Sequence, residues 1–349
     1  MVRVPDELEE LLAPEWLTAA LQARFPGIVV TAVEVGQVIR RVSIVAFFRI
    51  ECAGGVPDGL SPNLVAKGYF GETLRHVRHV GEPEAHFYRE LATPSGLRSL
   101  RCVYADIDPE TRHGVVITED AGAAGGVFLD ALSDYGPDTA AETLEQYAML
   151  HAATWSNPSY AVEPALAPRF VGLASHFDTD FLTVNVEGPL GHGIPAAARD
   201  ADRLRQAYQH VVAASATAAP WSVIHGDVHV GNILLDAQGR PGLVDWQLVQ
   251  RGAWYLDIGY HLGSALSVDD RRVHEDDLLR HYLSCLAAHG VDAPAFDVAR
   301  SLLGLGMIHG MFLWSITRQV DAAVISTLLG RLGTAVDDHE AFAAADALA

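Results

Sequence analysis

The spacing of hydrophobic residues changes along this chain and separates a strand-rich first third from a largely helical remainder. Leucines and a tryptophan recur at helical spacing over residues 5–24, so one helix is expected there. Residues 28–70 are rich in β-branched residues and are interrupted by glycines and prolines, which predicts several strands joined by turns. Shorter apolar runs predict two more strands at 103–105 and 114–118, and residues 82–91 are expected to form a helix before them.

Beyond about residue 119 the hydrophobic pattern favours helices. Apolar residues at helical spacing predict helices over residues 139–155, 202–216, 272–289, 301–319 and 322–349. Residues 157–200 contain many Pro, Gly and Phe residues without a clean period, and we expect an irregular insertion there. No internal repeat is visible.

The stretch 223–246, VIHGDVHVGNILLDAQGRPGLVDW, places a group of polar residues between apolar runs. Its first residues are typical of a buried strand end, and a polar loop follows that holds His225, Gly226, Asp227, His229 and Asn232. The apolar run 233–235, the turn residues 236–241 and the run 242–244 predict a hairpin that ends at Asp245. We therefore expect Asp227, Asn232 and Asp245 to lie close together.

Two carboxylates and an amide in this order suit phosphoryl transfer. One carboxylate accepts the proton of an attacking hydroxyl, while an amide and a second carboxylate hold the magnesium that bridges nucleotide phosphates. In the protein-kinase pattern H-R-D-x-x-x-x-N the base and the metal-binding Asn are about five residues apart. Asp227 and Asn232 have the same spacing, and Asp245 follows the hairpin where a metal-binding Asp is needed. An ordinary loop of turn-forming residues is the alternative, and the ordered set of three disfavours it.

Gly226 stands where protein kinases carry Arg, and this H-G-D form resembles the aminoglycoside phosphotransferase and choline kinase-like superfamily. The D-W-Q sequence at residues 245–247 and the opening APEWLTAAL are similar to the ecdysteroid kinase-like branch. The resemblance implies an α+β, two-lobed protein-kinase-like fold with a small β-rich N-lobe. Residues 1–119 would form the nucleotide-binding lobe, and residues 120–349 the catalytic and substrate-binding lobe.

The resemblance also implies roles for individual residues. Asp227 would be the catalytic base, and Asn232 and Asp245 would bind Mg²⁺ beside ATP. Lys67, in the strand NLVAKGYF, would contact the phosphates and pair with Glu84 of the next helix. The remaining cofactor-binding candidates are Ser43, Val116 and Thr118. Ser43, with Arg40 and Arg41, belongs to the loop GQVIRRVS, which would cover the phosphates although it has a single Gly; residues 116–120 would pair with adenine through the backbone.

Asp257 has two interpretations. It resembles the family's aspartate that supports the catalytic loop through backbone groups, and it also stands where a helix cap is expected. The sequence does not decide between them.

Composition narrows the class of partner. The formal net charge of −20 argues against nucleic acid, because phosphate backbones are bound by clusters of Lys and Arg. Three widely spaced cysteines form no disulfide framework or metal pattern, and no H-E-x-x-H spacing occurs among the sixteen histidines, so His281 is interpreted as an ordinary helix residue. The first residues lack a signal-peptide core and no apolar run approaches membrane-spanning length, so a cytoplasmic protein without membrane contact is expected.

The sequence therefore predicts an ATP-dependent phosphotransferase that phosphorylates a hydroxyl of a small-molecule acceptor. An antibiotic-resistance kinase and a catalytically inactive nucleotide-binding protein are the alternatives. A metallophosphoesterase is disfavoured, because no D-x-H ligand pair occurs near the amino terminus. A neutral or apolar alcohol is favoured over a polycation, because residues 301–317 hold no acidic side chain. The expected apolar wall of the acceptor site is Trp155, Phe170, Phe177, Phe181, Met307, Phe312 and Trp314.

Overall fold

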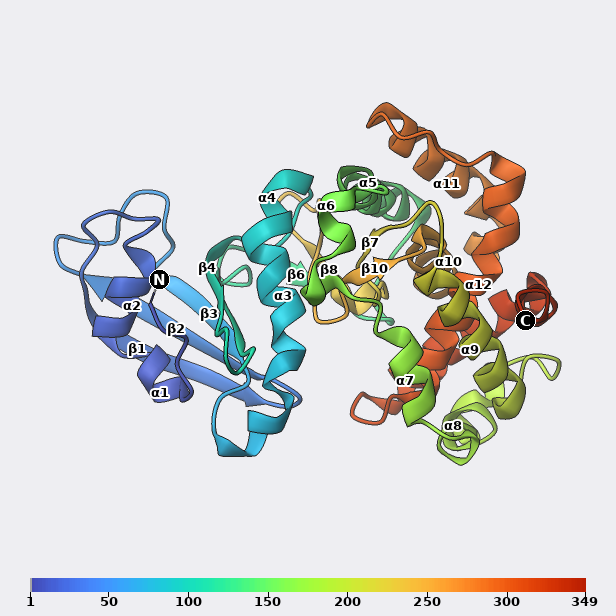
Figure 1. Cartoon of the computed structure of the whole chain (residues 1–349), viewed down its shortest axis with the longest axis horizontal. Helices are drawn as coiled ribbons and strands as arrows, with labels where there is room; N and C mark the ends of the chain where they lie inside the picture. The colour runs from blue at the N-terminus through green and yellow to red at the C-terminus, as the bar shows by residue number, and fades with distance from the viewer. Residues whose placement is uncertain (1) are drawn as a thin grey trace.

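The computed structural model describes residues 2–349, and its N-terminal part is built on an antiparallel sheet of five strands in the order β1-β2-β3-β5-β4 (Figure 1). The strands are β1 (Val30–Arg40), β2 (Ile44–Cys52), β3 (Asn63–Gly68), β4 (Cys102–Ile107) and β5 (Gly114–Glu119). Side chains alternate between the two faces of such a strand. In β3, Leu64 and Ala66 are buried in the core of this part, whereas Val65 and Lys67 point to the opposite face.

Two short helices, α1 (Leu8–Leu11) and α2 (Pro14–Leu21), cover the Leu64 face of the sheet. The prediction of one helix over residues 5–24 was therefore wrong. Pro14 has no backbone N–H and cannot continue a helix from the residues before it, so it opens a new helix instead. The apolar spacing runs through the break unchanged, because both helices pack on the same core.

A continuous helical segment connects β3 to β4 and lies between the sheet and the rest of the molecule (Figure 1). It consists of a 3₁₀ helix (Glu72–Gly81), α3 (Glu82–His86), a π-helical turn (Phe87–Leu91) and α4 (Ala92–Ser95). The predicted helix at 82–91 is confirmed. The π-helical turn was not foreseen, and π turns are frequent at functional sites.

The C-terminal part is mostly helical (Figure 1). Its helices are α5 (Pro137–Thr154), α6 (Pro158–Ala161), α7 (Phe170–His176), α8 (Thr179–Val186), α9 (Ala201–Ala216), α10 (Trp254–Ala265), α11 (Val268–Ala288), α12 (Phe296–Ile316), α13 (Ala322–Asp338) and α14 (Ala341–Asp346). Four of the predicted long helices are confirmed. The fifth predicted helical stretch, residues 322–349, forms two helices, α13 and α14, which are separated at Glu340, whose φ is +47°. Residues 157–200 contain three short α-helices, α6 to α8, and two 3₁₀ helices, Pro164–Leu166 and Pro189–Gly193, so the expectation of an irregular insertion was wrong in part. Helices of one or two turns are too short to give a hydrophobic period.

Five short strands complete this part. They are β6 (Val127–Phe128), β7 (Ser222–Ile224), β8 (Ile233–Leu235), β9 (Pro241–Leu243) and β10 (Gln250–Gly252). The strands β8 and β9 form the predicted hairpin, and β7 pairs with β10. The predicted lobe boundary at residues 119 and 120 falls at the end of β5, and it stays a prediction.

The helices α10 and α12 cross at close range in the centre of the C-terminal part. A Cβ on Gly259 would lie 2.1 Å from the carbonyl oxygen of Leu303, and one on Gly306 would lie 2.1 Å from that of Tyr255. Glycine is therefore required at both positions. By length and composition alone α12 is apolar enough to cross a membrane, contrary to the sequence expectation, but 67% of its most apolar window is buried inside the protein. Its hydropathy is accounted for by its place in the core.

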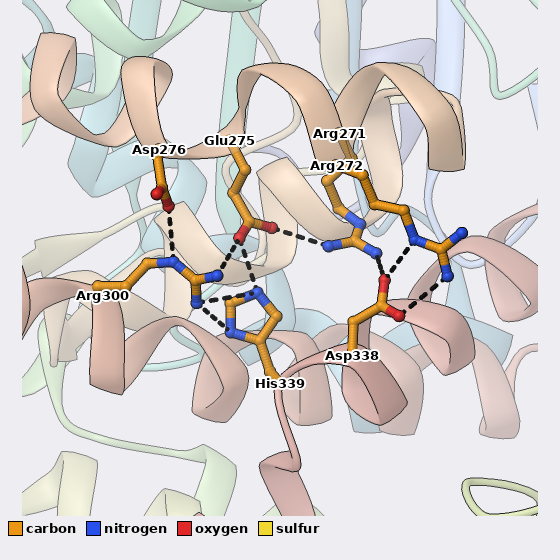
Figure 2. Close-up of polar contacts among 7 residues, drawn as sticks. All are labelled: Arg271, Arg272, Glu275, Asp276, Arg300, Asp338 and His339. Carbon is orange, nitrogen blue, oxygen red and sulfur yellow. Dashed lines mark hydrogen bonds and ion pairs between the residues drawn. The ribbon is translucent and has the colours of Figure 1, made fainter.

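An ionic network joins α11, α12 and α13 (Figure 2). Arg271 on α11 is almost fully buried and contacts Glu275, 3.0 Å away, and Asp338 at the end of α13. Glu275 also lies 2.7 Å from Nε2 of His339 and 3.4 Å from Arg300 on α12. These contacts fix the ends of three helices that pack around the core.

Candidate active site

The loop between β7 and β8 turns sharply at Gly226, whose φ is +83°. A Cβ at this position would lie 2.7 Å from the carbonyl oxygen of Leu248 and 2.8 Å from the ring of Phe170. A left-handed residue with neighbours this close must be glycine. The H-G-D sequence therefore follows from the shape of the loop, which presents Asp227 immediately after the turn.

Asp257, in the first turn of α10, holds this loop from behind. Its carboxylate is fully buried and accepts hydrogen bonds from the backbone N–H groups of His225 and Gly226, at 2.7 and 2.9 Å. Nε2 of His151 on α5 lies 3.1 Å from the same carboxylate. Burial raises the pKa of Asp257, but the hydrogen bonds from His151 and Gly226 outweigh it and lower the pKa below its usual range. The sequence allowed Asp257 to be either a support of the loop or a helix cap, and these contacts show that it supports the loop.

Asn232 and Asp245 meet at the other end of the loop. Nδ2 of Asn232 donates to the backbone oxygen of Asp227 at 2.7 Å, which leaves its Oδ1 available to a cation. The backbone N–H of Val244 donates to the backbone oxygen of Asn232 at 3.0 Å and brings Asp245 beside it. Asp245 has φ +64°, a conformation that is costly for a residue other than glycine and is found most often at functional sites.

Lys67 reaches this group from the sheet. Its Nζ lies 2.8 Å from Oε2 of Glu84 on α3 and 2.9 Å from Oδ1 of Asp245. Burial lowers the pKa of Lys67, but the two carboxylates outweigh it and keep the ammonium charged. Burial raises the pKa of Asp245, but the charge of Lys67 outweighs burial and lowers the pKa below its usual range. Glu84 is more deeply buried, so burial outweighs Lys67 there and the pKa of Glu84 is raised.

A cavity of about 290 Å³ lies between the sheet and the hairpin. Six of the predicted residues line it: Lys67, Glu84, Val116, Thr118, Asn232 and Asp245. Val45, Phe47 and Val65 supply apolar walls from β2 and β3. Ser43 is not brought into this cavity, because its side chain is buried at the β1–β2 turn. A role for Ser43 in phosphate binding therefore gains no support from its position.

Asp227 lines a second cavity of about 600 Å³. Gly231 lines both cavities, so the two meet at the loop that carries the predicted base. Arg41, from the predicted phosphate loop, also lines the second cavity. Of the expected apolar wall only Trp314 reaches it, whereas Phe170 and Phe312, like Met307, are buried in the core. Trp155, Phe177 and Phe181 do not line it either, so most of the expected wall lies elsewhere. Phe170, Met307 and Phe312 pack in the core instead, which is the usual place of large apolar side chains.

Three residues contact Asp227 or its hydrogen-bond partner, and of these only Tyr260 was not singled out in the sequence. The hydroxyl of Tyr260 donates to Oδ1 of Asp227 at 3.1 Å and accepts from Nε1 of Trp314 at 2.7 Å. Nε2 of His229 lies 3.7 Å from the same Oδ1, and burial lowers the pKa of His229 although Asp227 opposes the effect. The hydrophobic spacing of α10 and α12 does not indicate that Tyr260 and Trp314 form a hydrogen-bonded chain to Asp227.

The lysine content of the sequence is a further indication that Lys67 has a specific role. Lys67 is the only lysine in the chain, and the other 23 of its 24 basic residues are arginines. A compact ammonium on a flexible stem and a planar guanidinium are not interchangeable. A chain that uses arginine everywhere else and lysine here indicates that this position requires the ammonium.

Comparison with known proteins places the chain in a family. The sequence model of the ecdysteroid kinase-like family matches residues 87–292, more than half of the chain. The chain belongs to the ecdysteroid kinase-like family. The match covers the π-helical turn, the loop with Asp227 and the hairpin, and it confirms the resemblance noted in the sequence. No curated protein matches this family member in sequence.

Several solved structures resemble this ecdysteroid kinase-like protein. An ethanolamine kinase of Plasmodium vivax has 12% identity and a TM-score of 0.51, over 87% of this chain and 82% of that one. The choline kinase of Streptococcus pneumoniae has 13% identity and a TM-score of 0.46, over 94% and 98% of the two chains. An aminoglycoside phosphotransferase in complex with GDP and kanamycin has 16% identity and a TM-score of 0.46, over 86% and 89%. The ethanolamine kinase, with a TM-score above 0.5 at 12% identity, shows a likeness of fold alone, and with it the predicted two-lobed kinase-like fold is confirmed.

Proposed function

We propose that this protein transfers the γ-phosphate of ATP, in the presence of Mg²⁺, to a hydroxyl of a small-molecule acceptor. The observation that carries the proposal is the junction of the two cavities at Gly231. One cavity holds Lys67, Glu84, Asn232 and Asp245, and the other holds Asp227. A phosphate donor and an alcohol bound in these cavities meet at the loop.

The smaller cavity suits the nucleotide. Its apolar walls from β2, β3 and β5 accept the adenine ring. Val116 and Thr118 contribute side chains to these walls rather than backbone groups, because β5 is paired with β3 on one edge and with β4 on the other. The ammonium of Lys67, fixed by Glu84, orients the phosphates and offsets their negative charge. Of the predicted phosphate loop, Arg41 lines the adjoining cavity, whereas Ser43 lines neither.

The donor set at the base of this cavity fits magnesium. The free Oδ1 of Asn232 and the carboxylate of Asp245 are hard oxygen ligands, the type that Mg²⁺ prefers while it keeps several waters. When bound there, magnesium would neutralise phosphate charge. Backbone hydrogen bonds hold the two residues side by side, and because Lys67 occupies Oδ1 of Asp245, Oδ2 is the oxygen left for the cation.

Asp227 acts as the base. Tyr260 occupies its Oδ1, which leaves Oδ2 to accept the proton of the acceptor hydroxyl. The acceptor oxygen then forms a bond to the γ-phosphorus, the bond between this phosphorus and the bridging oxygen breaks, and ADP leaves with the electron pair. A positioned base of this kind contributes about 10²–10⁴ to the rate.

The larger cavity favours a neutral or apolar alcohol over a polycation such as an aminoglycoside. Its walls include Leu129, Leu173, Leu248, Leu313, Trp314, Ile316, Val320 and Val324. Among residues 2–349, the carboxylates that line it are Asp130 and Asp227, and Arg41 adds a positive charge. A polycation needs several convergent carboxylates to replace its hydration, and this cavity does not offer them.

Calorimetry with ATP, with and without Mg²⁺, tests the nucleotide site. We expect magnesium to strengthen ATP binding to the wild-type protein, and the gain to be lost in Asn232→Ala and Asp245→Ala. Asp236→Ala is the matched control, since Asp236 caps the turn of the same hairpin outside both cavities. Equal magnesium dependence in all four proteins would remove Asn232 and Asp245 from the metal site.

A further inference from the structure

Glu145, His281 and Cys285 bring three different metal-ligating groups together, away from both cavities. Glu145 lies on α5, and the other two lie four residues apart on α11, on one face of that helix. Nε2 of His281 is 3.3 Å from Oε1 of Glu145 and 3.6 Å from Sγ of Cys285. All three ligand atoms lie within 4.8 Å of one another, and the side chains are partly exposed.

Hydrogen bonding does not account for both contacts of His281 at once. If Nε2 carries a proton, it donates to Glu145 and has no lone pair left for the Cys285 thiol. If Nε2 lacks a proton, it accepts from the thiol, and its lone pair then faces the carboxylate of Glu145. A cation at the centre of the group satisfies all three atoms together.

The spacings fit tetrahedral coordination. Zinc lies about 2.0–2.1 Å from histidine nitrogen, about 2.3 Å from thiolate sulfur and about 2.0–2.2 Å from carboxylate oxygen. At tetrahedral angles these bond lengths separate nitrogen from oxygen by about 3.3 Å and nitrogen from sulfur by about 3.5 Å. The contacts of His281, at 3.3 and 3.6 Å, already have these lengths.

We propose that Glu145, His281 and Cys285 bind a zinc-type divalent cation, with a water molecule as the fourth ligand. Imidazole and thiolate select zinc over the hard cations Mg²⁺ and Ca²⁺. Binding deprotonates the Cys285 thiol and releases its proton to solvent. The site is separate from the proposed magnesium site at Asn232 and Asp245.

The cation would fasten α5 to α11 beside the support of the catalytic loop. Tyr282 follows His281, and its hydroxyl lies 2.8 Å from Nδ1 of His151 on α5. The other nitrogen of His151 contacts Asp257, which holds the loop. Zinc therefore stabilises the same helix pair from its outer side.

Cobalt spectroscopy of the purified, reduced and chelator-treated protein tests the proposal. We expect one equivalent of Co²⁺ to give a thiolate-to-cobalt charge-transfer band and the intense visible bands of tetrahedral Co²⁺. Zn²⁺ should abolish both, and excess Mg²⁺ should not. Cys285→Ser should lose the charge-transfer band, and His281→Gln and Glu145→Gln should lose tetrahedral binding. Cys52→Ser, Cys102→Ser and Asp245→Ala are the controls, and should retain the full spectrum.

Thermal unfolding supplies a second readout that does not depend on spectroscopy. Zn²⁺ should raise the melting temperature of the wild type and of Cys52→Ser, and should not raise that of Cys285→Ser. A cooperative unfolding transition of Cys285→Ser without metal is the control that this variant is folded. Bands that persist in Cys285→Ser, or a wild type that gives no tetrahedral cobalt spectrum, would overturn the proposal.

Discussion

The hydroxyl of Tyr260 donates a hydrogen bond to Oδ1 of Asp227, and α10 thereby fixes the orientation of the proposed base. Trp314 on α12 completes the chain, since its indole N–H donates to the same hydroxyl at 2.7 Å. Burial, with the neighbouring Asp227 carboxylate, raises the pKa of Tyr260, so the hydroxyl stays protonated and remains a donor at neutral pH. Tyr260 is a positioning residue that acts through Asp227.

Tyr260→Phe should lower kcat about 3–10-fold, the usual effect of losing one hydrogen bond of about 0.5–1.5 kcal/mol, and leave the KM for ATP unchanged. The matched control is Tyr147→Phe. Tyr147 is also fully buried, and its hydroxyl finds no hydrogen-bond partner within residues 2–349. Steady-state kinetics of both variants would decide. A loss of kcat in Tyr147→Phe as large as in Tyr260→Phe would point to general loosening of the core instead.

Lys67 offers a direct way to locate the nucleotide. An acyl phosphate of ATP places a reactive carbonyl at the terminal phosphate, and its adenosine part directs it to the nucleotide cavity. Because Lys67 is the only lysine, we expect acylation at this residue, mapped by peptide mass spectrometry, and protection by excess ATP with Mg²⁺. Lys67→Arg keeps the charge but provides no amine, so it should escape acylation. Labelling confined to the amino-terminal amine, or unaffected by ATP, would contradict the assignment of the cavity.

The network in Figure 2 predicts a large stability difference between two adjacent arginines. Arg271→Met leaves the buried Glu275 without its 3.0 Å partner and should cost about 3–5 kcal/mol in the free energy of unfolding. Arg272→Met removes only a largely exposed pair with Asp338 and should cost at most about 1 kcal/mol. Urea unfolding measures both values. Equal costs would mean that burial of Arg271 does not determine its contribution.

The pH dependence of this difference has a definite sign. Burial raises the pKa of Glu275, but hydrogen bonds from His339 and Arg271 outweigh it and lower the pKa below its usual range. A carboxyl with a lowered folded-state pKa stabilises the protein fully above its unfolded pKa, about 4.3 for Glu, and loses this contribution as the pH falls through the folded value. The difference in the free energy of unfolding between wild type and Arg271→Met should therefore be constant near neutral pH and become smaller below about pH 4. A gap that widens with acid would show that Glu275 is not the responsible group.

The predicted residues Asp227, Asn232, Asp245, Lys67 and Glu84 were accessible from the sequence because their chemistry prescribes their type and order. A base and two oxygen ligands must stand at fixed positions around one loop, and the lysine strand must precede them. The structure brings Lys67, Glu84 and Asp245 into direct contact.

Tyr260 and Trp314 could not be predicted in the same way. They converge on Asp227 because α10 and α12 cross closely at Gly259 and Gly306, and the backbone contacts there leave no mark on the hydrophobic period. The break at Pro14 illustrates the opposite case. The hydrophobic period is continuous over residues 5–24 and predicts one helix, but Pro14 has no backbone N–H and divides the segment into α1 and α2.

Product formation by Asp227→Asn tests the central claim most directly. Wild type, Asp227→Asn and Asp236→Asn would each be incubated with ATP, Mg²⁺ and a panel of neutral, aromatic and cationic alcohols, with phosphorylated products measured by mass spectrometry. We expect the wild type and Asp236→Asn to phosphorylate a neutral or apolar alcohol, and Asp227→Asn to bind ATP equally well but to form product about 10²–10⁴ times more slowly. Equal product formation by Asp227→Asn, or tight binding of ATP by a wild type that phosphorylates no alcohol, would contradict the account.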